Sequence, residues 1–298
     1  MRLPAVLVLL VLMATPAHST PRIVGGVPVD DVAEAPWVVA LTTTSGAQFC
    51  GGALLGPTQV VTAAHCVQGR EPASITVVGG RLDLRTDVGV TTAGASYRLV
   101  DGYVTPSRGK DIALLTLAEP LPYQPLPVAD PGVHMPGTVG VVYGWGRQAE
   151  HDTNKSPLLH KAFVPIWADG QCAATYARYD AQSMFCAGYP DGGIDACIDD
   201  SGGPYVVNGR LAGIVSWGIG CARPNAPGVY TRVTTYLTPK PQTTSPTDIV
   251  RNTAAHTASS AVVTPGRFNR PATREAASTI INSHTAASPR NTTASMAS

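Results

Sequence analysis

Short runs of strand-forming residues, separated by turn residues, constrain the fold of this chain more than any other feature. Between residues 23 and 235, apolar runs of four to six residues alternate with stretches that contain Gly, Pro, Asp and Asn. The clearest runs are residues 37–41, 59–62, 74–78, 112–117, 138–142, 211–215 and 228–233. Many short strands with regular turn signals predict an all-β sandwich or barrel. The sequence favours a short helix only over residues 169–179, with Asp169 as its N-cap.

The N-terminus has the composition of a secretory signal peptide. Arg2 supplies a positive charge, residues 6–13 form an unbroken apolar run, and Ala17 and Ser19 fit a cleavage pattern of small residues. The run is too short to span a bilayer, so we expect a secreted protein with no membrane span. We assign residues 1–19 to the signal peptide, with a signal-anchor as the alternative.

The C-terminal segment is a different kind of polypeptide from the middle of the chain. Residues 23–238 contain 13 Lys and Arg against 18 Asp and Glu, whereas residues 239–298 contain 6 against 2. The C-terminal segment is rich in Ser, Thr, Ala and Pro and buries too little apolar surface to offset chain entropy. We predict a disordered tail over 239–298, either a secreted linker or stalk, or the product of an altered gene end. The net charge of +1 does not indicate a nucleic-acid partner.

All 6 cysteines lie within residues 23–238. In an exported protein they favour a disulfide framework, although six cysteines allow fifteen pairings and sequence alone does not choose among them. No Cys-x-x-Cys motif or paired Cys and His spacing suggests zinc. We therefore predict neither a catalytic metal nor a cofactor, and leave a structural calcium ion open.

Three short motifs contain the residue types that nucleophilic catalysis needs. Ser201 stands between Asp200 and two glycines, His65 stands in the run Thr-Ala-Ala-His-Cys, and Asp111 opens an apolar run. A serine hydroxyl needs an adjacent base to become a nucleophile, and the base needs a group that orients it. The motifs follow in the order His, Asp, Ser with gaps of 46 and 90 residues. Together they resemble the trypsin-like (chymotrypsin-fold) serine endopeptidases, closest to secreted bacterial-type trypsins with three disulfides.

This resemblance implies a fold and a disulfide pattern. Family members consist of two six-stranded antiparallel β-barrels with the active site in the cleft between them, so we expect one protease domain over 23–238. The Pro-rich stretch 120–135 is the expected boundary between the barrels. The implied disulfides are Cys50–Cys66, Cys172–Cys186 and Cys197–Cys221. The family's C-terminal helix would start near residues 233–237, where Pro239 and Pro241 would shorten it.

The resemblance also assigns roles to the three motif residues. Ser201 would be the nucleophile, His65 the base and then the acid, and Asp111 the carboxylate that orients the imidazole. The partners would be peptide or protein substrates and proteinaceous inhibitors, and the protein would act as a monomer.

The segment after the signal peptide resembles the family's activation junction. Cleavage after Arg22 would remove the propeptide 20–22 and give Ile23 a free α-ammonium group. In the family this group inserts into the second barrel and pairs with the acidic residue before the nucleophile, here Asp200. Since a buried carboxylate without a partner is costly, this pair can switch the oxyanion loop on after cleavage.

Residues around the nucleophile resemble the specificity pocket of family members that cut after Arg or Lys. Asp195, six residues before the nucleophile, stands where those members carry the aspartate at the base of the pocket. A buried carboxylate there would pair with a cationic side chain and reject neutral ones. Gly218 and Gly228 would keep the pocket open, and the strand Ser216-Trp217-Gly218 would pair with the substrate backbone.

Asp199 departs from the family pattern, which has glycine two residues before the nucleophile. The backbone N–H groups of Asp199 and Ser201 would form the oxyanion hole, and Asp tolerates left-handed backbone better than most residues. The N–H donor survives, but a carboxylate about 6 Å from the developing oxyanion would cost about 2–3 kcal/mol at an effective dielectric of about 20. We therefore expect a weakened protease or one with altered inhibitor contacts. The alternative is a protease-fold protein that binds basic peptides and turns them over poorly.

Overall fold

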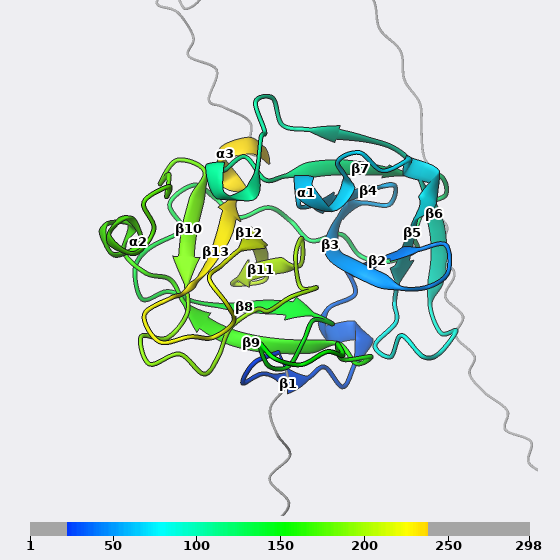
Figure 1. Cartoon of the computed structure of the whole chain (residues 1–298). Helices are drawn as coiled ribbons and strands as arrows, with labels where there is room; N and C mark the ends of the chain where they lie inside the picture. Colours follow the sequence, from blue (N-terminus) through cyan, green and yellow to red (C-terminus); the bar gives the residue numbers. More distant parts are fainter. Residues whose placement is uncertain (1–22, 238–298) are drawn as a thin grey trace, which may run out of the picture. The chain divides into compact units, whose positions relative to one another are not determined.

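The computed structural model describes residues 23–237, which form two β-barrels packed side by side (Figure 1). The predicted signal peptide (1–19), the propeptide (20–22) and the tail (239–298) lie outside the described residues. Among residues 23–237, no helix has the length and apolar character needed to cross a membrane.

The first barrel is a closed antiparallel sheet of six strands in the order β2-β3-β4-β7-β6-β5. Its strands are β2 (Val38–Thr43), β3 (Gln48–Gly56), β4 (Gln59–Thr62), β5 (Ile75–Gly79), β6 (Val90–Leu99) and β7 (Ala113–Leu117). β2 buries nearly all of its residues, because one face lines the barrel and the other contacts β8 of the second barrel. β6 has mostly exposed and half-buried residues, so it lies on the solvent-facing side of the barrel.

The second barrel contains six longer strands and one short addition. Its strands are β1 (Val27–Pro28), β8 (Val139–Gly144), β9 (His160–Pro165), β10 (Met184–Ala187), β11 (Pro204–Val207), β12 (Arg210–Trp217) and β13 (Gly228–Arg232). They pair antiparallel in the order β1-β9-β8-β11-β12-β13-β10. A bridge between Ile166 and Ala187 brings the end of β9 back to β10, so this sheet curls on itself. The predicted fold class, all-β with two antiparallel barrels, is confirmed.

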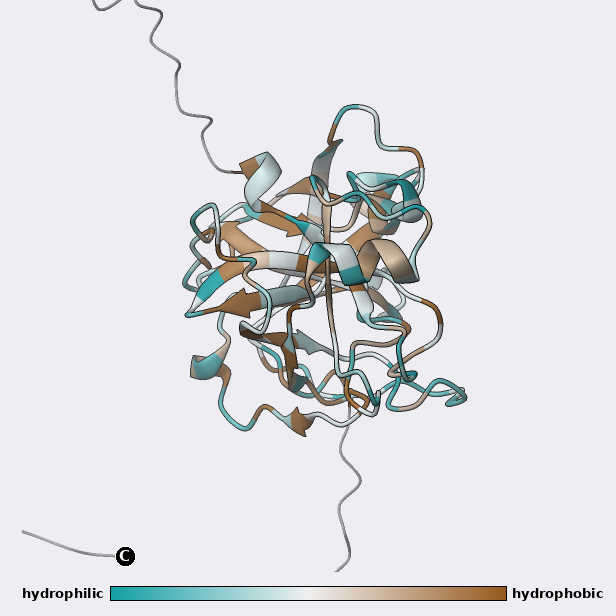
Figure 2. Ribbon diagram, turned by 90° about the vertical axis from the view of Figure 1, so that its left-hand side faces the viewer, coloured by the Kyte–Doolittle hydropathy of each residue, from teal (hydrophilic) through white to brown (hydrophobic). Residues whose placement is uncertain are grey.

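Each barrel has an apolar interior, and Figure 2 shows hydrophobic residues concentrated on strands and hydrophilic ones on the connecting loops. In the second barrel three buried rings pack together: Phe185 lies 5.1 Å from Tyr205 and 5.3 Å from Tyr230, centroid to centroid. The buried Tyr205 hydroxyl donates a hydrogen bond of 2.7 Å to the carbonyl of Val164. This hydrogen bond offsets the cost of burying the hydroxyl group, so a large ring can fill the core.

The segment 118–138 joins the two barrels and contains the expected boundary. Its backbone bonds first to one barrel and then to the other: Leu126 N donates to Leu54 O at 2.8 Å, and Ala129 N donates to Leu211 O at 2.9 Å. The linker therefore follows the surface of both barrels rather than leaving them free to separate.

Helices are few, and the predicted one differs in its detail. The α-helices are α1 (Ala64–Val67), α2 (Asp169–Thr175) and α3 (Thr234–Leu237), and the 3₁₀ turns are η1 (Val32–Glu34), η2 (Pro72–Ser74) and η3 (Pro106–Arg108). The assignment of Asp169 as N-cap was wrong: Ala168 is the cap, and Asp169 is the first helical residue. Asp169 Oδ1 instead accepts a hydrogen bond of 2.9 Å from Arg232 Nη2. An acidic residue in the first turn still suits the positive end of the helix dipole.

Candidate active site

His65 and Asp111 lie beside the adjacent ends of two paired strands in the first barrel. His65 lies in α1, just after β4, and Asp111 lies just before β7, the strand that pairs with β4. Asp111 Oδ2 is 2.8 Å from His65 Nδ1, and Asp111 Oδ1 accepts a hydrogen bond of 3.0 Å from the His65 backbone N–H. The Asp111 side chain is 0% exposed and that of His65 is 27% exposed. The buried carboxylate thus holds the imidazole ring through its Nδ1 atom.

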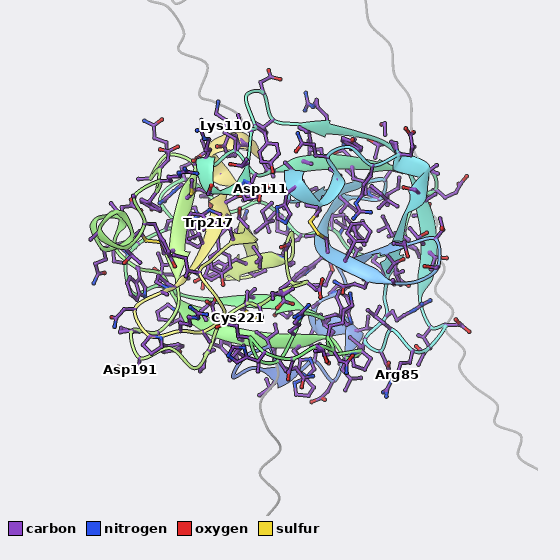
Figure 3. All side chains as sticks on the ribbon, in the orientation of Figure 1. Arg85, Lys110, Asp111, Asp191, Trp217 and Cys221 are labelled. Atoms are coloured by element: carbon purple, nitrogen blue, oxygen red, sulfur yellow. A yellow bond between two sulfur atoms is a disulfide. The ribbon has the colours of Figure 1, made fainter. Side chains whose placement is uncertain are left out.

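The second barrel supplies two further hydrogen bonds to Asp111, which lies where the barrels meet (Figure 3). Ser216 Oγ donates to Asp111 Oδ2 at 2.6 Å, and Thr231 Oγ1 donates to the Asp111 carbonyl at 2.8 Å. The sequence predicts Ser216 on a substrate-pairing strand and gives no sign of this contact with the carboxylate. The two residues are 105 positions apart, so no local motif could have indicated it.

Ser201 lies on the loop before β11, and this loop is held by both barrels. Gly51 N donates to Ser201 O at 2.8 Å, and Gly202 N donates to Val215 O at 2.8 Å. Gly202 has φ of +78°, and a Cβ there would lie 2.5 Å from the Gly51 carbonyl oxygen, so glycine is required. Within residues 23–237, Ser201 Oγ has no hydrogen-bond partner, His65 Nε2 included. In serine hydrolases, the hydrogen bond between nucleophile and base is often long without substrate and tightens when substrate binds.

Two backbone N–H groups of this loop are free to bind a ligand. Asp200 N donates to Cys197 O at 3.1 Å, whereas the N–H groups of Asp199 and Ser201 meet no acceptor within the described part of the chain. Asp199 has φ of +73°, the left-handed region that glycine enters most easily. An aspartate therefore holds the backbone shape expected of glycine, and both N–H groups remain available to an oxyanion.

The Asp199 carboxylate lies beside two cationic side chains that its sequence motif does not indicate. Its Oδ2 atom lies 3.9 Å from Arg147 Nε and 3.8 Å from Lys155 Nζ, and the side chain is 25% exposed. The Asp199 carbonyl accepts a hydrogen bond of 2.8 Å from Gln48 Nε2. These three neighbours carry no motif and meet Asp199 only in the folded chain, so sequence reasoning missed them.

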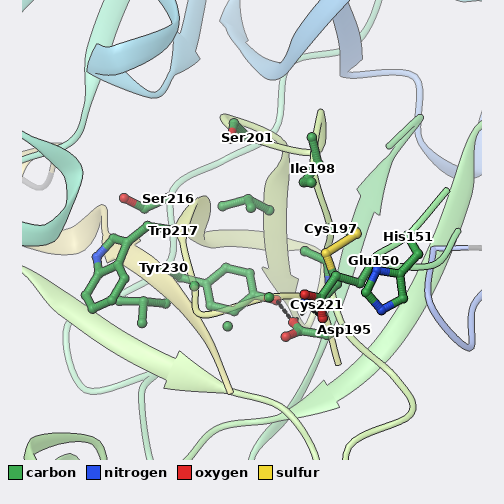
Figure 4. Close-up of a pocket in the computed structure, with 16 residues that line it drawn as sticks. Glu150, His151, Asp195, Cys197, Ile198, Ser201, Ser216, Trp217, Cys221 and Tyr230 are labelled. Carbon is green, nitrogen blue, oxygen red and sulfur yellow. Dashed lines mark hydrogen bonds between the residues drawn. A yellow bond between two sulfur atoms is a disulfide. The ribbon is translucent and has the colours of Figure 1, made fainter. Parts of the chain in front are cut away.

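A pocket of about 420 Å³ extends from Ser201 towards Asp195 (Figure 4). Asp195 is 3% exposed, and its Oδ1 atom accepts hydrogen bonds of 2.8 Å from Ala196 N and 3.3 Å from the Tyr230 hydroxyl. Burial raises the pKa of Asp195 to about 7, against the lowering effect of these hydrogen bonds. Within the described residues no cationic side chain pairs with it, so the pocket ends in a carboxylate that a cationic ligand would stabilise in its ionised form.

The walls of the pocket include the other predicted residues and two that were missed. Ser216, Trp217, Gly218 and Gly228 all line it. A Cβ on Gly228 would lie 2.6 Å from Asp195 Oδ1, so any larger residue would press on the carboxylate. Glu150 and His151 also line the pocket, and they lie in a loop without a recognisable motif. Glu150 forms an ion pair with Arg223, which joins this loop to the one after β12.

Asp200 and Ile23 are both fully buried in the second barrel. Asp200 Oδ1 accepts 2.7 Å from Gly146 N, and its Oδ2 accepts 2.9 Å from Cys197 N. Burial, with a smaller effect of the nearby Asp199 charge, raises the pKa of Asp200 to about 7 despite these donors. Beside Ile23, the backbone of Val24 pairs with Asp195, whose N–H donates to Val24 O at 3.1 Å.

Three disulfides join Cys50 to Cys66, Cys172 to Cys186 and Cys197 to Cys221, which are the pairs that the resemblance implied. The first ties α1 to β3, and the third ties the loop that carries Ser201 to the loop after β12. Cys50, His65 and Cys66 place possible metal-ligand atoms within 4.8 Å of one another. Because both sulfurs belong to one disulfide, they offer no thiolate to a metal.

Comparison with known proteins gives a consistent family. A family model described as Trypsin matches residues 23–238. A trypsin from Saccharopolyspora erythraea is 43% identical over 216 residues, which cover 72% of this chain and 94% of that protein. Anionic trypsin from Canis lupus familiaris is 37% identical over 76% of this chain and 90% of its own length. A vitellin-degrading protease from Bombyx mori is 39% identical, covering 71% of this chain and 81% of that protein. The chain belongs to the trypsin family of serine endopeptidases.

Proposed function

We propose that this protein is a secreted endopeptidase that hydrolyses peptide bonds after Arg or Lys and is activated by cleavage after Arg22. The observation that carries this proposal is the pocket that runs from Ser201 to the buried carboxylate of Asp195. If the side chain of a substrate Arg or Lys reached Asp195, the backbone carbonyl group of that residue would lie beside Ser201.

In the proposed reaction Ser201 Oγ attacks the carbonyl carbon of the peptide bond while His65 Nε2 accepts the hydroxyl proton. The carbonyl oxygen becomes an oxyanion and accepts hydrogen bonds from the N–H groups of Asp199 and Ser201. When the C–N bond breaks, His65 gives its proton to the leaving amine, and an acyl ester on Ser201 remains. Water then attacks this ester in the same way, with His65 again as base. Asp111 stabilises the imidazolium throughout.

Asp195 would select the substrate by charge. A guanidinium or ammonium group would pair with the ionised carboxylate and return its pKa from about 7 towards the ordinary range. A neutral side chain would leave Asp195 either ionised and unpaired or protonated, and both states are costly in a closed pocket. Substrates with Arg or Lys before the cleaved bond would therefore react fastest.

Activation would act through Asp200. In the intact chain Ile23 carries an amide, and Asp200 is a buried carboxyl without a cationic partner among the described residues. Cleavage after Arg22 would create an α-ammonium group on Ile23 that can pair with it. Arg22 itself satisfies the proposed specificity, so one active molecule could activate the next.

The second candidate, a protease-fold protein that binds basic peptides with poor turnover, rests on Asp199 in place of glycine. The two cations beside its carboxylate reduce the electrostatic objection to catalysis, so we favour the enzyme. We further propose a monomer that proteinaceous inhibitors can block, since the site is complete within one chain.

A panel of matched peptide substrates tests the proposal. Secreted protein whose N-terminus is Ile23 should hydrolyse peptides with Arg or Lys before the cleaved bond at least about 100-fold faster, by kcat/KM, than peptides with Gln or Phe. The Ser201→Ala variant is the matched control and should show no turnover. Equal rates on Arg and Gln peptides would refute the specificity, and tight binding of Arg peptides without turnover would favour the second candidate.

A further inference from the structure

Arg147 and Lys155, which we call the cation pair, are held together at the nucleophile loop. Their backbones form an antiparallel bridge with each other. Arg147 N also donates a hydrogen bond of 2.9 Å to the carbonyl of Ile198, the residue before Asp199. The loop that carries the cation pair is thus bonded to the loop that carries the oxyanion donors.

The side chains of the cation pair converge on a single carboxylate. Asp199 Oδ2 lies 3.9 Å from Arg147 Nε and 3.8 Å from Lys155 Nζ, at distances longer than hydrogen bonds. Arg147 Nε is buried and has no hydrogen-bond partner in the described part of the chain. Arg147, Lys155 and Asp199 together carry a net charge of +1.

Gln48 completes the arrangement from the first barrel. Its side chain is buried, and Nε2 donates to Asp199 O at 2.8 Å and to Cys50 O at 3.2 Å. Lys155 Nζ donates to the Gln48 carbonyl. The Asp199 peptide is therefore fixed by a neutral donor on its carbonyl, while the cation pair faces its carboxylate.

We propose that Arg147 and Lys155 are positioning residues for the oxyanion hole: they offset the Asp199 charge, so that the Asp199 N–H can bind an oxyanion although glycine is absent. This proposal rests on the proposed function. Without the cation pair, the carboxylate would oppose the negative charge that develops on the substrate oxygen. Because that charge exists in the transition state and not in the bound substrate, the loss would fall on kcat more than on KM.

A double-mutant cycle tests the proposal. Arg147→Met and Lys155→Met, singly and together, are made in the natural chain and in the Asp199→Gly chain. In the natural chain the double change should lower kcat about tenfold with KM changed less than about twofold, as two half-exposed charge pairs allow. In the Asp199→Gly chain the same change should lower kcat less than about threefold. Lys155→Arg, which keeps the charge, should retain the activity of the natural chain.

Arg85→Gln is the matched control, because it also removes one positive charge, from an exposed ion pair with Asp83 away from the site (Figure 3). Its kcat should be unchanged. All rates are divided by the concentration of sites titrated with a fluorophosphonate, so misfolded protein does not count as lost catalysis. If the double variant does not fold, the two single variants complete the cycle.

The outcomes separate this inference from the proposed function. Equal losses of kcat in the natural and Asp199→Gly chains would overturn the inference, because the cation pair would then act without Asp199. No loss in either chain would overturn it too. An untitratable, inactive natural chain would instead refute the proposed function.

Discussion

Replacing Asp200 by Asn in the uncleaved chain isolates the electrostatic cost on which activation would depend. Asp200 is fully buried, and in the intact chain its carboxylate has two N–H donors and no cationic partner within the described residues. Arg22→Gln blocks cleavage, and Ser201→Ala in every variant prevents self-digestion during the measurement. Asn keeps the size of the side chain and removes the titration.

The size of the effect follows from the pKa of Asp200. Burial raises this pKa from 3.8 to about 7 in the folded chain, so the folded state holds a proton that the unfolded state has lost. The contribution of Asp200 to the stability of the uncleaved chain is therefore fully present below pH 4 and is lost as the pH rises towards 7. A shift of about three units corresponds to a loss of about 4 kcal/mol. Asp195 lowers the free energy of unfolding by a similar amount in the chains with Asp200 and with Asn, so its effect cancels in their difference.

Urea unfolding at pH 4 and at pH 8 measures this difference, with the disulfides intact. Between these two values, the free energy of unfolding of the uncleaved Asp200→Asn chain should fall by about 4 kcal/mol less than that of the uncleaved chain with Asp200. In chains cleaved after Arg22, the Asp200→Asn change should instead lower the free energy of unfolding at pH 8, because the Ile23 ammonium group loses its partner. The same pH dependence with Asp200 and with Asn, or no effect of cleavage, would refute the reasoning.

Three further changes probe the pocket and the carboxylate that would orient His65. Asp195→Asn should lower kcat/KM on an Arg peptide by about 10²–10⁴, because a buried charge pair is lost. The kcat/KM on a Phe peptide, measured in parallel, should not fall. Asp111→Asn should lower kcat by about 10⁴ at neutral pH with little change in unfolding temperature, and a loss below tenfold would contradict its role. Gly228→Ala should raise KM for Arg peptides by about tenfold, because its Cβ would lie 2.6 Å from Asp195 Oδ1; unchanged KM would show that the pocket relaxes.

Seven of the thirteen strands within residues 23–237 overlap the apolar runs of the sequence, because their residues favour strands locally. The apolar run 59–62 coincides with β4, and the run 112–117 differs from β7 by one residue. β3 was not among the clearest runs, since Gly51 and Gly52 lower its strand propensity. A Cβ at Gly51 would lie 3.1 Å from Gly203 Cα in the other barrel. Glycine is therefore needed at position 51 because the two barrels pack closely there, which the local sequence does not show.

The site also contains residues that the sequence indicates and residues that only the fold brings together. His65, Asp111 and Ser201 stand in motifs, and the structure brings the first two within 2.8 Å of each other. Asp199 was recognised as a departure, but the effect of its charge was predicted without Arg147 and Lys155. Nothing in the sequence near those two residues indicates that they approach residue 199, because the fold alone joins their loops.

Labelling with a fluorophosphonate tests the central claim, an activated serine at position 201, most directly. Secreted protein is sequenced from its N-terminus, labelled before and after cleavage behind Arg22, and the modified residue is located by mass spectrometry. We predict one label per chain, on Ser201, that appears only when Ile23 is the N-terminal residue and is lost in His65→Ala. Folded protein with Ile23 at its terminus and no label on Ser201 would contradict the account.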